Sequence, residues 1–542
     1  MATYIFAIGG TGSRVLRSLV MLSAAGSRGT GTAQEIVPII FDYDAQNGDL
    51  KSTDTLLMQY QKIHRKAYPN GLVGTENFFS TSFTPIRNKQ IRAGVLGGQL
   101  QFNPNFEYAA YIQPAANNAN TFSTYLGYGQ LTGNLEPTQK LLDALYNNSA
   151  ANDPTSEINM DFNVGFKGCP NIGCLVATHF TDTAEFRHFT RTFNVNNDSI
   201  IIVGSVFGGT GASGIPVLMH ALRSNANVGA NARISLLAMG PYYKISDQNG
   251  GVVNSNTFVA KFKAAMKAYG QGAENSVNNQ ANRIYYVADG DTQAPLNYCD
   301  GGQNQTNPPF MAELIGAMCL LDCCSNPPQV NQHEAKKVAL DDYAPISRYD
   351  QNRNQWVMPT QDYDGMQHGN HFRWKHFDNS GLKIAYLRPM VRLAFLERFL
   401  RQHQPGAGEN WWNDPNRGIG SVPLFLGDLT VFLNSFTKYL VDLRGNHRPM
   451  DLINTAAQQY DKFLDDVPLA EKKSLLNLNP WQINDKKISD EMVKQWRDYT
   501  NPQNGVPANN SKEYDFIQVA DRAMKSIDSE IANHYNNGIY SR

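Results

Sequence analysis

A glycine-rich stretch at residues 199–223 contains the residue types that bind an anion. It reads Ser-Ile-Ile-Ile-Val-Gly-Ser-Val-Phe-Gly-Gly-Thr-Gly-Ala-Ser-Gly-Ile-Pro-Val-Leu-Met-His-Ala-Leu-Arg. Gly208, Gly209 and Gly211, on either side of Thr210, leave backbone N–H groups unobstructed by a Cβ atom. A helix that begins here adds the positive end of its dipole. The stretch therefore predicts a phosphate-binding loop.

A strand and a helix must position this loop, and the same order of elements occurs at the start of the chain. The β-branched run 200–203 predicts a strand buried on both faces, and the apolar spacing in 215–222 predicts a helix. Residues 4–8 and 15–22 repeat this pattern around Gly-Gly-Thr-Gly-Ser-Arg at 9–14. Alone, this second loop is also typical of dinucleotide-dependent and adenylating enzymes.

Two such loops on neighbouring strands can contact one polyphosphate. The alternative is that the glycines only allow tight packing of each helix on its strand, without a ligand. Glycine is costly where the backbone does not need it, so we favour phosphate binding.

Acidic and amide residues follow the next predicted strand, 36–41, in the order Asp42-Tyr43-Asp44-Ala45-Gln46-Asn47. The carboxyl ends of parallel strands form the edge where ligands bind. For Asp42 and Asp44 two roles are open, capping of a helix and contact with a metal ion. A Mg²⁺ ion held mainly by phosphates needs only one protein carboxylate.

Strands alternate with helices up to about residue 325, which predicts an α/β fold with a doubly wound parallel sheet. A third glycine turn occupies 165–173, a strand at 284–287 ends near Asp289, and 310–321 predicts a buried helix. Residues 51–161 are rich in amide and aromatic residues, and we expect an irregular insertion of short strands and loops there.

The remainder of the chain has a different character. Residues 326–380 are polar and predict a connector without regular structure, and 381–542 predicts a mostly helical domain. The helices expected in it cover 387–401, 422–443, 451–464, 490–499 and 517–531.

Composition narrows the class of protein. A chain of 542 residues with 42% hydrophobic residues is expected to form two or more domains. The formal net charge of −1 gives no reason to expect a nucleic-acid partner. No apolar run reaches the roughly 18–20 residues of a membrane span, and no signal-type segment opens the chain, so we expect a cytoplasmic protein. The six cysteines lack disulfide or zinc spacing and are interpreted as buried thiols.

The three glycine loops and the acidic loop at 42–47, taken in their order along the chain, resemble the loops of the tubulin/FtsZ superfamily. Phe207-Gly-Gly-Thr-Gly-Ala-Ser-Gly is similar to its Gly-Gly-Gly-Thr-Gly-Ser/Thr-Gly signature, and 41–46 is similar to its Asn-Thr-Asp-Ala-Gln loop. The resemblance covers about the first 320 residues, interrupted by the insertion, and is greater to divergent bacterial tubulin-like proteins than to ordinary tubulin or FtsZ. It implies a nucleotide-binding domain at 1–325 that binds GTP or GDP, with Mg²⁺, and polymerises head to tail.

The resemblance also implies roles for particular residues. Asp289 and Asn307 fall where the family contacts the base. The residues that would line the phosphate and metal region are Gly10, Thr11, Gly12, Ser13, Arg14, Asp44, Gly168, Gly208, Gly209, Thr210 and Gly211.

Three departures from the family pattern bear on activity. Phe207 replaces the first signature glycine and is expected to narrow that loop, and Arg14 replaces an Asn and is expected to add a cation to the phosphates. The family's catalytic loop after the central helix has no clear counterpart. Its nearest candidates are Asp341, Asp342 and Asp322. Nucleotide binding is thus better supported than hydrolysis.

The function expected is that of a GTP-binding protein that self-associates into filaments or rings. The alternative is a scaffold that does not hydrolyse nucleotide and recruits membrane-remodelling or defence partners through residues 51–161 or the helical region. A dinucleotide oxidoreductase or adenylating enzyme would leave residues 208–214 unexplained.

Overall fold

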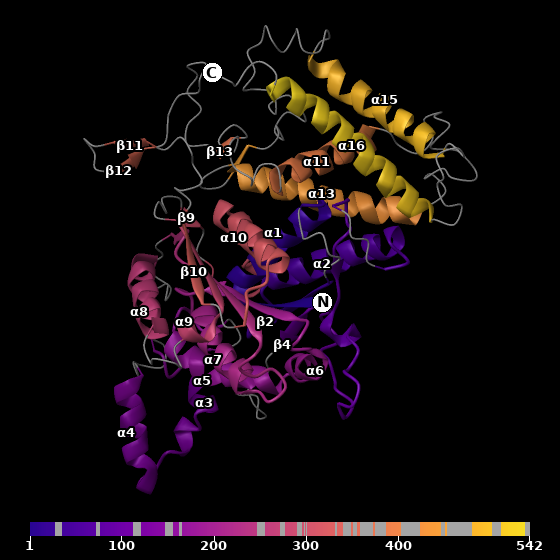
Figure 1. Cartoon of the computed structure of the whole chain (residues 1–542). Helices are drawn as coiled ribbons and strands as arrows, with labels where there is room; N and C mark the ends of the chain where they lie inside the picture. The colour runs from indigo at the N-terminus through magenta and orange to yellow at the C-terminus, as the bar shows by residue number, and fades with distance from the viewer. Residues whose placement is uncertain are drawn as a thin grey trace.

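The computed structural model describes residues 1–27, 35–71, 76–111, 121–146, 156–161, 165–246, 255–270, 277–289, 295–296, 299, 301–330, 333–339, 348–350, 355–357, 372–373, 386–402, 423–445, 450–451, 480–500 and 511–536. Figure 1 shows a central sheet with helices on both faces and a further layer of helices from the end of the chain.

The centre of the molecule is an eight-stranded sheet in which all strand pairs are parallel. In spatial order its main path is β10 (Glu334–Ala339), β8 (Arg283–Ala288), β6 (Arg233–Met239), β5 (Ser199–Ser205), β1 (Ala2–Ile8), β2 (Glu35–Asp42) and β3 (Ser82–Phe83), and β4 (Ala109–Tyr111) also pairs with β2. Going from β1, the chain first adds strands on the β2 side and then, from β5 onward, on the other side. The sheet therefore has a topological switch point between β1 and β5, where ligands bind in open α/β sheets.

Helices cover both faces of the sheet because its strands are apolar on both sides. Tyr4, Phe6 and Ile8 belong to one buried cluster, and Ile5 and Ala7 belong to the other. The second cluster includes α1 (Gly9–Ala24), α2 (Gly48–Ala67) and α10 (Met311–Ser325), whereas the first includes α5 (Pro170–Ala177), α6 (Ala184–Thr192) and α7 (Gly209–Ser224). The predicted α/β class with a parallel sheet is confirmed.

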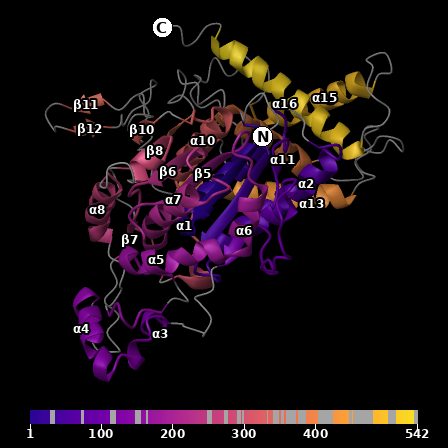
Figure 2. The same cartoon turned by 60° about the horizontal axis from the view of Figure 1, so that its bottom comes forward.

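The expectation of an irregular insertion is wrong for the helix α2, which continues from Gly48 through Ala67. Leu56, Leu57, Tyr60 and Ile63 are buried at helical spacing. β3 and β4, which follow α2, join the main sheet. The later helices α3 (Phe122–Tyr125) and α4 (Glu136–Leu145) project from the body of the molecule (Figures 1 and 2).

The predicted connector at 326–380 also contains regular structure. Its β10 pairs in parallel with β8 and extends the sheet, so the expectation of an unstructured segment is wrong there. Further along, β11 (Arg348–Asp350) pairs with β12 (Gln355–Val357), and β13 (Phe372–Arg373) pairs with β14 (Met450–Asp451). The other elements are β7 (Lys244–Ile245), α8 (Phe258–Gly270), α9 (Val277–Gln280) and β9 (Pro295–Leu296).

Four long helices form the C-terminal part, in agreement with its predicted helical character: α11 (Arg388–Gln402), α13 (Pro423–Gly445), α15 (Pro480–Thr500) and α16 (Lys512–Asn536). The helix expected at 451–464 lies, from residue 452 on, outside the described residues. In Figure 1 these helices form a layer over α1, α2 and α10. The Tyr439 hydroxyl donates to Ser18 Oγ (2.9 Å), and Asn77 Nδ2 donates to Gln518 Oε1 (2.8 Å). The layer thus shares one core with the sheet domain.

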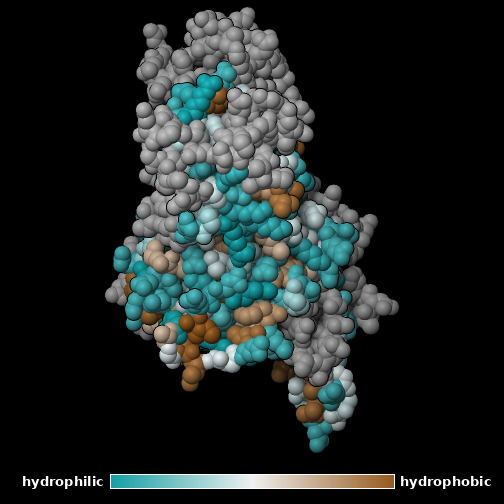
Figure 3. Space-filling view, turned by 90° about the vertical axis from the view of Figure 1, so that its right-hand side faces the viewer, coloured by the Kyte–Doolittle hydropathy of each residue, from teal (hydrophilic) through white to brown (hydrophobic). Residues whose placement is uncertain are grey.

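No helix in the described part of the chain is both long and apolar enough to span a bilayer. The described residues on the face in Figure 3 are mainly hydrophilic, with smaller, separate hydrophobic areas.

Candidate functional site

The helices α1 and α7 begin beside each other at the switch point of the sheet. α1 begins at Gly9, directly after β1, and α7 begins at Gly209, shortly after the adjacent β5. Neither helix has a side-chain cap at its N-terminus or an acidic residue in its first turn. The positive ends of both dipoles are therefore not compensated from within their own helices, as an anion site requires.

The glycine loop at the start of α1 and the glycine loop at the start of α7 are in contact. Gly9 has a φ of +69°, and a Cβ atom added to it would lie 3.2 Å from Cβ of Thr210. Thr210 and Gly10 are partly exposed, as is Gly208. A Cβ on Gly10 would make only ordinary contacts, of 3.4 Å or more. These positions can present backbone N–H groups to a ligand.

Other glycines of the same loops are required by packing. A Cβ on Gly12 would lie 2.7 Å from the carbonyl carbon of Ala7, and one on Gly211 would lie 2.3 Å from the carbonyl oxygen of Ser205. Ser13 is buried and donates its hydroxyl to the carbonyl of Gly9 (3.1 Å). For Gly12, Gly211 and Ser13, tight packing of helix on strand accounts for the residue type.

The third glycine turn joins the other two at Thr210. Gly165 and Gly168 have φ values of +78° and +79°. A Cβ on Gly165 would lie 4.0 Å from Thr210 Oγ1, and one on Gly209 would lie 3.1 Å from the backbone nitrogen of Gly168. The structure thus brings together the three loops that the sequence singles out.

Lys261 of α8 is a residue at this site that sequence reasoning missed. Its ammonium group donates to the carbonyl of Gly168 (2.9 Å). The sequence around it does not distinguish it from Lys263 and Lys267 of the same helix. Only the folded chain places this cation beside the third loop.

Arg14 does not supply the phosphate-facing cation that the sequence predicts. It is 2% exposed, and its Nε donates to Glu313 Oε1 (2.6 Å) while Nη1 donates to Asp49 Oδ2 (2.9 Å). Nη2 donates to the hydroxyl groups of Tyr242 (2.8 Å) and Thr11 (3.3 Å). Burial alone would lower the pKa of this guanidinium, but Tyr242, Glu313 and Asp49 raise it well above its ordinary value. Arg14 joins α1, α2 and α10 beneath the loop.

Phe207 also lies inward, so it does not narrow the loop as expected. Its side chain is 1% exposed and packs against Phe258 at 4.9 Å between ring centroids. Tyr242 and Tyr243 complete this aromatic cluster.

Asp42 and Asp44 bind backbone groups of the loops around them. Asp44 accepts from the N–H groups of Gln46 (2.9 Å) and Gly302 (2.6 Å), and burial raises its pKa. Oδ1 of Asp42 accepts from the N–H groups of Tyr43 (2.8 Å) and Asp44 (3.3 Å). Burial and the neighbouring Asp44 carboxylate raise the pKa of Asp42 to about 7.

Neither aspartate caps α2, because the cap is Asn47. Its side-chain oxygen accepts from the N–H groups of Asp49 (2.9 Å) and Leu50 (3.2 Å). The described residues contain no group of three or more His, Cys, Asp or Glu that could hold a metal ion by itself. A metal contact of Asp44 through a bound phosphate stays a prediction.

Residues 301–307 lie against the loop before α2 and against the first turn of α2. The carbonyl of Gln305 accepts from the Asp49 N–H (2.9 Å), and a Cβ on Gly10 would lie 3.6 Å from Gln305 Nε2. Asn307 donates its backbone N–H (3.0 Å) and its side-chain amide (2.9 Å) to Asp49. This segment therefore lies beside the first glycine loop, and its contribution through Gln305 was not predicted.

Asp289 and Asn307, which the resemblance assigns to contacts with the base, lie in different parts of the fold. The N–H of Asp289 donates to the carbonyl of Pro241 (3.0 Å) at the end of β8, which β6 and β5 separate from β1. Asn307 instead bonds to Asp49 at the start of α2.

The acids considered for catalysis lie away from the glycine loops or outside the described residues. Asp322 is near the end of α10, nine residues after Glu313 and hence about 13 Å along the helix axis from the Arg14 network. It accepts from the Tyr285 hydroxyl and from Asn326 Nδ2 (3.1 Å). Asp341 and Asp342 are outside the described residues.

A scan of the chain against protein-family models matches none, and comparisons with curated protein sequences and with solved structures find no match.

Proposed function

We propose that the chain binds GTP or GDP where the three glycine loops meet and that it self-associates into filaments or rings, as tubulin/FtsZ-like proteins do. The observation that carries the proposal is the convergence of Gly9, Thr210 and Gly165 at the switch point of a parallel sheet. Two helix N-termini without caps begin at the same place. Backbone N–H groups and positive dipole ends together suit a polyphosphate.

The neighbouring side chains are compatible with this ligand. Lys261 provides a cation beside the third loop. Asp44 is the carboxylate that the sequence resemblance assigns to a phosphate-bound Mg²⁺. Gln305 lies next to Gly10 and offers an amide to a nucleotide. The choice of guanine over adenine comes from the sequence resemblance alone.

One observation favours the second candidate, a nucleotide-binding scaffold that does not hydrolyse GTP. Asp322, the candidate acid within the described residues, is occupied by hydrogen bonds from Tyr285 and Asn326. Arg14 is likewise held in its buried network and does not reach the loops' exposed side. Hydrolysis would need an acid from elsewhere to orient the attacking water.

Sedimentation and negative-stain imaging of the full chain with GTP, with GDP and without nucleotide separate the two candidates. Polymers that form with GTP and disperse as phosphate is released support the GTPase filament. Oligomers that are indifferent to nucleotide, together with GTP binding and no phosphate release, support the scaffold. A monomer that retains no nucleotide and binds none would refute both.

A further inference from the structure

The arm formed by α3 and α4 carries apolar side chains away from the body of the molecule (Figures 1 and 2). No residue of α4 is buried. Leu141 and Leu145, one helical turn apart, are 57% and 61% exposed, and Pro137 and Ala144 on the same side are exposed as well. We call these four residues the arm face. Leucines exposed in a row on one side of a helix are typical of a contact surface.

The arm itself occupies the other side of α4. Tyr146, directly after the helix, packs edge-on against Phe122 with 4.9 Å between the ring centroids, and Asp143 accepts from the Tyr128 hydroxyl. These contacts fix the orientation of the helix, so the arm face is the side that it presents to solvent.

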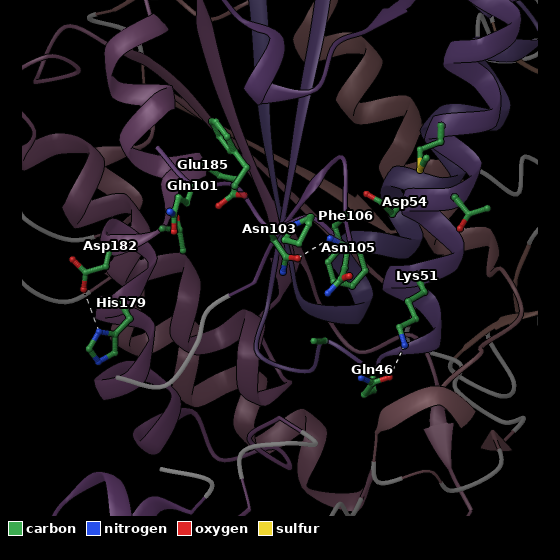
Figure 4. Close-up of a pocket in the computed structure, with 17 residues that line it drawn as sticks. Gln46, Lys51, Asp54, Gln101, Asn103, Asn105, Phe106, His179, Asp182 and Glu185 are labelled. Carbon is green, nitrogen blue, oxygen red and sulfur yellow. Dashed lines mark hydrogen bonds and ion pairs between the residues drawn. The ribbon is translucent and has the colours of Figure 1, made fainter. Parts of the chain in front are cut away.

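The base of the arm is attached to the body at the start of α6. The Tyr125 hydroxyl of α3 is hydrogen-bonded to Nε2 of His179 (3.3 Å), and Nδ1 of His179 is hydrogen-bonded to Asp182 (3.2 Å). Figure 4 shows His179 and Asp182 together on one side of a cleft whose other side is formed by α2. The arm therefore leaves the body from a defined place.

A second exposed apolar group lies on residues 91–98, which we call the Leu96 loop. Leu96 is 96% exposed, and Ile91 is 39% exposed. The loop is held on α6, because the Arg92 N–H donates to the carbonyl of Arg191 (3.1 Å) and Arg191 Nη1 donates to the carbonyl of Gly98 (3.0 Å). A leucine side chain is thus presented to solvent on a tethered backbone.

The surroundings of the Leu96 loop are basic. Arg92 and Arg191 donate to backbone carbonyls and form no ion pair with a carboxylate among the described residues. The nearby cations Arg87 and Lys89 are already paired, with Glu107 and Glu35 respectively. Two guanidinium groups at the loop are therefore without a compensating carboxylate in the described part of the chain.

The arm carries the opposite formal charge. Its described residues, 121–146 and 156–161, have four carboxylates and one ammonium group: Glu136, Asp143, Glu157, Asp161 and Lys140. Opposite charges around two apolar surfaces favour their association and its specificity. The arm face and the Leu96 loop are thus complementary both in apolar character and in charge.

These two surfaces do not meet within one chain. Leu96 is almost completely exposed, and α4 and α6 lie apart in both Figure 1 and Figure 2. We propose that the arm face of one copy docks on the Leu96 loop of a second copy of this chain. Because the two surfaces differ, the contact is heterologous, and each pair keeps one loop and one arm face for further copies.

This contact rests on the self-association part of the proposed function and gives it an interface. It does not need nucleotide, since neither surface includes the glycine loops. A helix of ten residues is about 15 Å long, so a single contact is small and reversible. Repetition of the contact produces filaments or rings.

Sedimentation velocity of the full chain without nucleotide, over a series of concentrations, tests this contact. We expect reversible oligomers of the wild type that shorten as the ionic strength rises, because salt screens the charges around both surfaces. Leu141→Gln changes the arm face and Leu96→Gln changes the loop. Each should weaken self-association by about tenfold or more, because it removes an apolar side chain from the contact.

The matched control is Leu424→Gln, which makes the same change at an 80% exposed leucine of α13. Its self-association should differ from that of the wild type by less than about twofold. Leu141→Gln should also have the same melting temperature as Leu424→Gln, because both leucines are exposed.

A mixture of the two interface variants gives the decisive result. Leu141→Gln retains an intact loop, and Leu96→Gln retains an intact arm face. An equimolar mixture should therefore form pairs with one copy of each variant and no longer oligomers. Neither variant alone should form pairs at the same concentration.

Oligomers of the wild type that both variants reproduce would overturn the docking, as would a wild type that stays monomeric without nucleotide. Pairs formed by Leu96→Gln alone would also overturn it, because α4 would then bind α4 of the second copy. So would a melting temperature of Leu141→Gln below that of Leu424→Gln, which would mean that the arm face is covered within its own chain. The proposed nucleotide site fails separately, through absence of GTP binding by the wild type.

Discussion

Arg14 shows that a residue in a ligand-binding motif can serve the fold beneath it. Its guanidinium is enclosed with Asp49 and Glu313, whose side chains are fully buried. Without Arg14, these two buried carboxylates would keep only longer ion pairs to Arg17 (3.8 and 4.0 Å), which is strongly unfavourable in the interior. The glycine loop at residues 9–14 is therefore stabilised by buried ion pairs beneath it as well as by the close packing of its glycines.

Replacement of this cation is predicted to destabilise the protein. Arg14→Met should lower the free energy of unfolding by about 3–5 kcal/mol, because it removes the guanidinium that is hydrogen-bonded to Asp49 and Glu313 and leaves them only the longer ion pairs to Arg17. Lys140→Met, which breaks an exposed ion pair with Glu136, should cost no more than about 0.5 kcal/mol. Chemical denaturation measures both, and a loss below about 1 kcal/mol for Arg14→Met would contradict the description of the network.

Asp42 should make stability depend on pH in a direction opposite to that of most aspartates. Its pKa in the folded state is raised to about 7, so between about pH 4 and 7 the folded state binds more protons than the unfolded state. The stabilisation by the protonated carboxyl is complete below pH 4 and is lost as the pH rises through 7.

Asp42→Asn keeps the oxygen that accepts the two backbone N–H groups and removes the charge. We expect it to be more stable than the wild type at pH 8, by roughly 2–4 kcal/mol, and the difference to shrink as the pH falls to 5. Thermal melts at both pH values measure this. An advantage of equal size at both would argue against titration of Asp42 as its source.

The sequence alone identified the glycine loops. It did not show whether the side chains of Arg14 and Phe207 point toward the ligand side of these loops or into the core. Arg14 and Phe207 meet partners as distant in the chain as Glu313 and Phe258. Nothing local distinguishes an arginine that contacts a phosphate from one enclosed by carboxylates, and only the folded chain shows the difference.

At the scale of elements, α2 connects the sheet domain with the C-terminal helices. It packs against α1, α13 and α16. On α13, Phe432 is fully buried and its ring lies 5.1 Å from that of Phe79 and 6.1 Å from that of Tyr60 in α2. The C-terminal layer and the sheet are therefore expected to unfold together.

Phe432→Ala should destabilise both parts by about 3–5 kcal/mol, because it leaves a cavity between α13 and α2. The six tryptophans all lie after residue 355, and Trp496 is buried on α15, so tryptophan fluorescence includes a signal from the C-terminal helices, while hydrogen exchange in β1 and β5 reports on the sheet. We expect one common shift of both signals. Val431→Ala, at a half-exposed neighbour, is the control. A shift confined to the tryptophan signal would show that the layer unfolds separately.

The strands and helices of the sheet core were predictable because their apolar runs are long and regular. The helix α2 was obscured by the amide-rich residues around it, although Asn47 as its cap and basic residues in its last turn are typical helix signals. The strand β10, Glu-Ala-Lys-Lys-Val-Ala, lacks an apolar run because it lies at the edge of the sheet, where lysines are common.

At the scale of the whole molecule, the sequence predicted the α/β class and a helical C-terminal part. It did not predict that these parts share one core, because the apolar faces of α1, α2 and α13 match only in three dimensions. Likewise the loops at the switch point were predictable one by one. The sequence did not predict that these loops meet at Thr210 or that the Arg14 side chain points into the core; both are seen only in the folded chain.

Nucleotide binding at Thr210 is the central claim, and a matched pair of variants tests it most directly. Thr210 is partly exposed in the first turn of α7, where the three loops meet. Thr210→Asp adds a negative charge that stabilises the N-terminus of α7 but repels a phosphate. Thr210→Asn introduces a side chain of similar size without the charge.

The measurement is equilibrium binding of a fluorescent GTP analogue, with Mg²⁺, to the wild type and both variants after their melting temperatures are shown to be similar. We predict that Thr210→Asp weakens binding by about 100-fold or more, and that Thr210→Asn weakens it by less than about tenfold. Equal binding by Thr210→Asp and Thr210→Asn, or no binding by the wild type, would contradict a phosphate site at these loops.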